Sequence, residues 1–90
     1  MTEDDDDDAA PRQLPAGIGY VWQRVAADLR DRIAGGAWPY GGRLPNRDEL
    51  AAEYGVADRT VRRALRELES EGLVTVMPAK GAYVTWSVHN

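Results

Sequence analysis

The chain has 90 residues, which is enough for one domain and too few for two. It has no cysteine, which excludes disulfides and thiolate chemistry, and no apolar run reaches the roughly 20 residues of a membrane helix. The formal net charge of −4 originates in residues 1–15, so the remainder of the chain is close to neutral.

Residues 1–15 are predicted to be a disordered acidic tail, separate from a folded domain over residues 16–90. Asp4 to Asp8 repel one another, and Pro11 and Pro15 disfavour regular structure. The tail is interpreted as a solubilising segment, as a polyanion that competes for a basic surface elsewhere in the chain, or as a divalent-cation site.

The first predicted helix spans residues 20–34. Its apolar residues recur at spacings of three and four, which forms one buried face, and Gly35 and Gly36 end it through a left-handed cap. The apolar face comprises Val21, Trp22, Val25, Ala26, Leu29 and Ile33.

A loop rich in glycine and proline follows, over residues 37–45, and leads to a second helix over residues 47–54. Asn46 is the expected N-cap, and Glu49 completes a capping box. The buried residues are expected to be Leu50, Ala51 and Tyr54, and Gly55 begins a tight turn.

The third helix is predicted over residues 59–71, with Asp58 as its cap and Gly72 after its end. Its apolar stripe comprises Val61, Ala64, Leu65 and Leu68. Two short runs rich in β-formers, residues 73–77 and 82–86, flank the turn 78–81 and predict a hairpin. The expected fold is therefore mainly α with a small β-hairpin, a winged helix-turn-helix of three helices plus a wing.

Four arginines share one side of the third helix, because they stand at positions i, i+3, i+4 and i+7: Arg59, Arg62, Arg63 and Arg66. Their mutual repulsion favours an anionic partner, and duplex DNA presents a dense line of phosphates. In the alternative interpretation, the arginines form ion pairs with Glu67, Glu69 and Asp58 on a solvated face.

Two further features support a DNA-binding unit. Only about four residues join the second and third helices, which holds the third helix at a large angle. The hairpin turn carries Lys80 and Gly81, and a glycine lets the backbone approach a phosphate closely. Generic three-helix packing and an ordinary hairpin turn are the alternatives.

Residues 20–85 resemble the DNA-binding domain of the GntR family of bacterial transcription regulators. The segments that carry the resemblance are residues 36–45, 46–51, 55–68, 71–74 and 80–84. The resemblance implies a two-fold dimer on operator DNA, with Thr60, Arg62 and Gly81 at the DNA. It also implies that helix 59–71 enters the major groove and that wing 77–82 contacts the backbone or the minor groove.

The chain departs from the family pattern at two places. Asn46, Arg47 and Asp48 replace the usual Ser-Glu-Arg, and Ala57 and Asp58 replace Ser-Arg. Arg47 and Arg59 each lie one residue from the replaced arginine, and one residue rotates a helical side chain by about 100°. The operator is therefore expected to differ from the family pattern. Because the chain ends just after the wing, no effector pocket is expected.

The sequence predicts a cytoplasmic, sequence-specific DNA-binding regulator that is not an enzyme and needs no cofactor or metal. The alternative is a winged-helix module that acts through protein contacts with a larger regulator. The expected partner is double-stranded DNA, a weak homodimer on DNA is left open, and no membrane contact is expected. The candidate DNA-binding residues are Asn46, Arg47, Arg59, Thr60, Arg62, Arg63, Arg66, Lys80 and Gly81.

Overall fold

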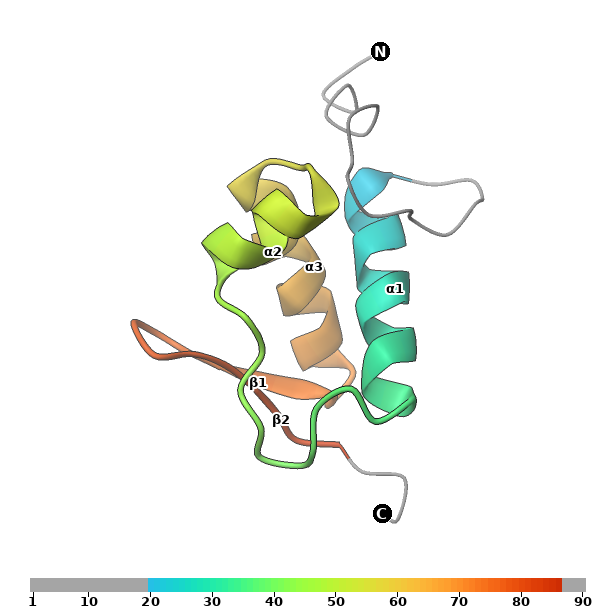
Figure 1. The fold of residues 1–90 in the computed structure, drawn as a ribbon, viewed down its shortest axis with the longest axis vertical. Coiled ribbons are helices and arrows are strands. Elements are labelled where there is room, and N and C mark those ends of the chain that lie inside the picture. The colour runs from blue at the N-terminus through green and yellow to red at the C-terminus, as the bar shows by residue number, and fades with distance from the viewer. Residues whose placement is uncertain (1–19, 87–90) are drawn as a thin grey trace.

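The elements follow one another in the predicted order in the computed structural model, which describes residues 20–86 (Figure 1). The helices are α1 (Val21–Ala34), α2 (Arg47–Tyr54) and α3 (Asp58–Ser70), and the strands are β1 (Val74–Met77) and β2 (Gly81–Val84). This arrangement confirms the winged helix-turn-helix prediction. The predicted acidic tail lies outside the described residues.

The core forms where α1 and α3 lie side by side, with α2 across one end and the hairpin at the other (Figure 1). The apolar stripes predicted for α1 and α3 are buried as expected, except that Trp22 is only partly buried. Leu44 from the loop before α2 and Val74, Ala82 and Val84 from the hairpin complete the same cluster. The helix pair and the hairpin therefore share one core, which holds α3 against a rigid base.

The boundaries of α2 agree with the prediction because local interactions define both ends. The Asn46 side chain accepts a hydrogen bond from the Glu49 backbone N–H at 2.8 Å, and the Asn46 N–H donates to the Glu49 carboxylate at 2.9 Å. Gly55 ends the helix in the left-handed conformation, with φ 70°.

The predicted start of α3 is wrong by one residue. The N-cap is Ala57, without a side-chain cap, and Asp58 is the first helical residue. Asp58 directs its carboxylate to Arg47 at 3.6 Å instead of capping its own helix. An acid in the first turn still stabilises the positive end of the helix dipole. The helix ends at Ser70, with Glu71 as its C-cap.

The hairpin is shorter and shifted relative to the prediction. Gly81 pairs with Met77, so it belongs to β2 rather than to the turn, and Ala79 adopts a positive φ of 65°. Thr85 donates its N–H to the Leu73 carbonyl at 2.9 Å, whereas Trp86 leaves the ladder and packs on the core.

The loop before α2 lies along the free edge of β2. The Leu44 N–H donates to the Ala82 carbonyl at 2.9 Å, and the Val84 N–H donates to the Gly42 carbonyl at 2.8 Å. Arg43 forms an antiparallel bridge with Tyr83 between these two bonds. The loop thus acts as a short third strand of the wing.

A polar cluster around Tyr54 ties α2 to α1. The Tyr54 hydroxyl donates to the Asp28 carboxylate at 2.5 Å and accepts from Arg32 Nη1 at 3.0 Å. Burial raises the pKa of Tyr54, and the bond to Asp28 raises it further. Arg32 also lies 3.2 Å from Glu53 and 4.7 Å from the centroid of the Trp38 ring. The phenol therefore stays protonated and acts as a fixed donor.

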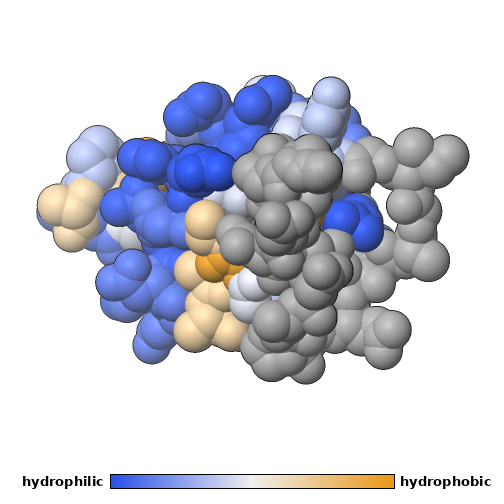
Figure 2. All heavy atoms as spheres, turned by 90° about the horizontal axis from the view of Figure 1, so that it is seen from above, coloured by the Kyte–Doolittle hydropathy of each residue, from blue (hydrophilic) through white to orange (hydrophobic). Residues whose placement is uncertain are grey.

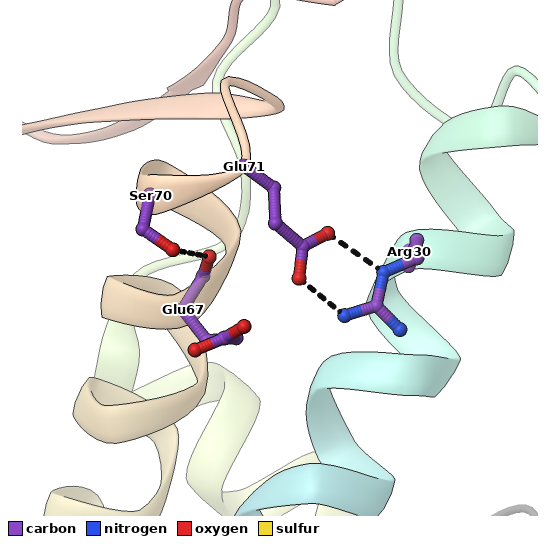
Figure 3. A network of polar contacts seen from close by, with 4 residues as sticks. All are labelled: Arg30, Glu67, Ser70 and Glu71. Atoms are coloured by element: carbon purple, nitrogen blue, oxygen red, sulfur yellow. Dashed lines mark hydrogen bonds and ion pairs between the residues drawn. The ribbon is translucent and has the colours of Figure 1, made fainter.

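A two-pronged ion pair joins the ends of α1 and α3. Arg30 Nε and Nη2 donate to the two carboxylate oxygens of Glu71 at 2.9 and 2.7 Å, while the Ser70 hydroxyl donates to the Glu67 carbonyl (Figure 3). The hydrogen bond from Arg30 lowers the pKa of Glu71. Both side chains remain partly exposed, at 40% and 31%.

Replacing Glu71 by glutamine is expected to lower the free energy of unfolding by less than about 1 kcal/mol at pH 7, since exposed pairs contribute little. Because the folded-state pKa of Glu71 is depressed, its contribution is complete above the unfolded-state pKa. It is lost as the pH falls through the folded-state pKa, which lies below the ordinary glutamate value. Urea unfolding of wild type and Glu71→Gln at pH 7 and pH 3 tests this. A difference that persists undiminished at pH 3 would contradict it.

Candidate nucleic-acid interface

A groove of about 580 Å³ runs between α3 and the hairpin. Its lining contains five basic side chains and one acidic side chain, Glu69, over an apolar floor that includes Leu65 and Val76. The basic residues are Arg43, Arg47, Arg62, Arg66 and Lys80. A concave surface with this charge excess attracts a polyanion.

The single acid of the groove is engaged by the wing. The Glu69 carboxylate accepts the backbone N–H of Val76 at 3.1 Å. Glu69 therefore holds β1 against α3, and no ion pair joins it to an arginine among residues 20–86.

Arg62 and Arg66 are exposed on the α3 wall of the groove, and Arg59 is exposed one turn earlier. Within the described part of the chain, none of the three forms an ion pair. The carboxylates proposed as local partners are used elsewhere in two cases, since Asp58 faces Arg47 and Glu69 bonds Val76. The arrangement favours an external anion over local pairing.

Arg63 is set apart from the other arginines of α3. Its guanidinium carbon lies 4.4 Å from the centroid of the Trp22 ring on α1, a cation–π contact. Arg63, Arg59 and Thr60 do not line the groove, and Thr60 is half-buried. Six of the predicted site residues therefore line the groove, and Arg59, Thr60 and Arg63 do not.

Asn46 and Arg47 bring the start of α2 to the groove. The Asn46 oxygen is occupied as the helix cap, and Arg47 lies 3.6 Å from Asp58 with 49% of its side chain exposed. The pair links the first turns of α2 and α3.

The hairpin forms the other wall and projects beyond the helices. Lys80 is exposed in the turn, and Met77 at the end of β1 is 44% exposed. Seen from above, the described surface is mostly hydrophilic, with one hydrophobic cluster near the middle and a smaller one at the far left, where the hairpin projects (Figure 2). The wing therefore presents both a cation and apolar surface.

Arg43 is a groove residue that the sequence analysis does not include. Its position depends on the pairing of the loop with β2, about 40 residues later in the chain, and no local pattern encodes that pairing. The sequence offers only a weak signal for a role of Arg43 in the groove, namely a basic residue shortly before a capping box.

No group of three candidate metal-ligating side chains occurs within residues 20–86. None of the helices in this range combines the length and the apolar character that a membrane-spanning segment needs.

Comparisons with known proteins agree on one family. Residues 22–84 match the family model described as "Bacterial regulatory proteins, gntR family". The chain is 35% identical over 74 residues to the histidine utilization repressor of Klebsiella aerogenes. That match covers 82% of this chain and 30% of the repressor, so the chain spans less than a third of that relative's length.

Solved structures share the fold. The DNA-binding domain of AraR, in complex with operator ORE1, matches with a TM-score of 0.70 and 26% identity, over 82% of this chain and 94% of that one. A GntR family transcriptional regulator from Listeria monocytogenes matches with a TM-score of 0.74 and 23% identity, over 83% and 66% of the two chains. At that identity the second match supports the fold alone.

Proposed function

This chain belongs to the gntR family of bacterial regulatory proteins, and on that basis we propose that its winged helix-turn-helix domain binds operator DNA sequence-specifically. The similarity to a histidine utilization repressor and to the AraR DNA-binding domain in complex with an operator supports this proposal. In this role the domain controls transcription by occupying a specific duplex site.

The observation that carries the proposal is the basic groove with exposed arginines on α3. Arg62 and Arg66 have no described carboxylate partner, so their charges repel until an anion binds. An α-helix with its side chains is about 10–12 Å across, and the major groove is about 12 Å wide, so the groove admits the 13-residue α3. We therefore place α3 in the major groove.

The proposed position of α3 also determines where the wing meets the duplex. With α3 in the major groove, residues 77–82 contact the flanking backbone or the minor groove, and Lys80 supplies a charge for phosphate. Apolar Met77 is available for sugar or base edges. The same proposal includes DNA contacts at the edge of the α3 interface, from Asn46, Arg47, Arg59 and Thr60.

A salt titration of duplex binding tests this function. Three to five phosphate contacts give a slope of log K against log salt of roughly −3 to −5. A flat slope would reject the proposal and favour the protein-interaction module. Selection of bound duplexes from a random pool then identifies the operator. An inverted repeat among the selected sequences would indicate that two copies bind together, which we propose for this domain.

A further inference from the structure

Arg43 is held at the base of the wing by backbone bonds on both sides of it. Leu44 and Gly42 each bond to β2, at 2.9 and 2.8 Å, and Arg43 itself bridges Tyr83. The loop runs beside the hairpin for this stretch (Figure 1). The backbone of Arg43 is therefore as well anchored as a strand residue, although it belongs to a loop.

The Arg43 side chain lies over Gly81. A Cβ atom added at Gly81 would lie 2.9 Å from Arg43 Nε, 3.5 Å from Nη2 and 3.6 Å from Cζ. The space above this glycine is thus occupied by a guanidinium group of the same chain. Gly81 also has a φ of 117°, which other residues rarely adopt. This glycine therefore serves as a seat for the arginine, rather than only as a point of close approach.

The seated guanidinium lies in the basic groove. Arg43 is exposed, lines the groove with Arg62 and Arg66, and forms no ion pair with another residue of the described range. Lys80 stands at the exposed turn, whereas Arg43 stands at the anchored base. A guanidinium with a fixed backbone and open donors is suited to an oxyanion such as phosphate.

We propose that Arg43, seated over Gly81, binds a backbone phosphate of the duplex that α3 enters. This inference rests on the proposed function and adds to it a positioning contact from the loop. A phosphate contact carries no base information, so Arg43 fixes the register of the domain on DNA without choosing the sequence.

Arg43→Gln is expected to reduce the steepness of the salt slope by about one and to weaken binding about tenfold at low salt. The sequences selected from a random pool are expected to stay the same. Arg43→Lys should recover part of the slope. Arg30→Gln is the matched control, because it removes one positive charge outside the groove, and it should leave the slope unchanged.

Gly81→Ala tests the seat. Its added Cβ should displace the guanidinium, so it should weaken binding by about as much as Arg43→Gln, also about tenfold. In an Arg43→Gln background the same change should cost less than in wild type, because only the strain of alanine at a φ of 117° remains. Additive losses would overturn the seat, and thermal unfolding checks that each variant remains folded.

An unchanged slope for Arg43→Gln would overturn the inference, and so would an altered base preference, which would indicate base reading. If wild type binds with a steep slope and Arg43→Gln retains it, only this inference fails. If wild type itself shows no salt-dependent binding, the proposed function fails and the inference fails with it.

Discussion

Replacing Arg62 by alanine is expected to weaken operator binding by about 10- to 100-fold, at every salt concentration. Arg62 is exposed on the groove wall of α3 and forms no ion pair among residues 20–86. A hydrogen bond from a charged donor contributes about 1.5–3 kcal/mol, which corresponds to that loss. Fluorescence anisotropy with the selected operator duplex measures the change.

Arg63→Ala is the matched control, because it removes the same charge from the adjacent residue of α3. Its guanidinium lies against Trp22, so its loss should reduce stability by about 0.5–1 kcal/mol and change affinity much less. Equal losses of affinity for the two variants would indicate that only total charge matters. Unchanged binding by Arg62→Ala would reject α3 as the reading helix.

Replacing Leu68 by alanine is expected to lower the free energy of unfolding by about 2–5 kcal/mol. Leu68 is fully buried in the cluster that joins the helices and the hairpin, so truncation removes buried surface and leaves a cavity. Small domains have a total stability of about 5–15 kcal/mol, so the loss is a large share. Urea unfolding followed by circular dichroism measures it.

Arg66→Ala is the control on the same helix, since Arg66 is exposed and should change stability by at most about 0.5 kcal/mol. The two variants should also separate by function, with Arg66→Ala reducing DNA binding and leaving the fold intact. A cost below about 1 kcal/mol for Leu68→Ala would mean that the core rearranges around the missing side chain.

The sequence predicts the parts of this fold that depend on residues close together in the chain. The ends of α2 follow from Asn46, Glu49 and Gly55, which act within one or two turns. The buried positions of α1 and α3 follow from helical periodicity, which needs no knowledge of the partner helix.

The parts that the sequence does not predict depend on how distant elements meet. Helical spacing groups Arg63 with the other arginines, but the neighbouring α1 places Trp22 under it. Asp58 is a reasonable cap from sequence, but the start of α2 brings Arg47 within reach of its carboxylate. The seat of Arg43 on Gly81 likewise requires the loop and β2 to pair first.

The bond between Glu69 and Val76 has a consequence for self-association. The loop before α2 covers the outer edge of β2, which leaves the outer edge of β1 available for pairing with a strand of another molecule. By occupying the Val76 N–H, the Glu69 carboxylate removes a donor that such a strand would need, and its charge repels other acidic chains. Glu69 weakens the attraction of the groove for polyanions, but it also disfavours aggregation through the outer edge of β1.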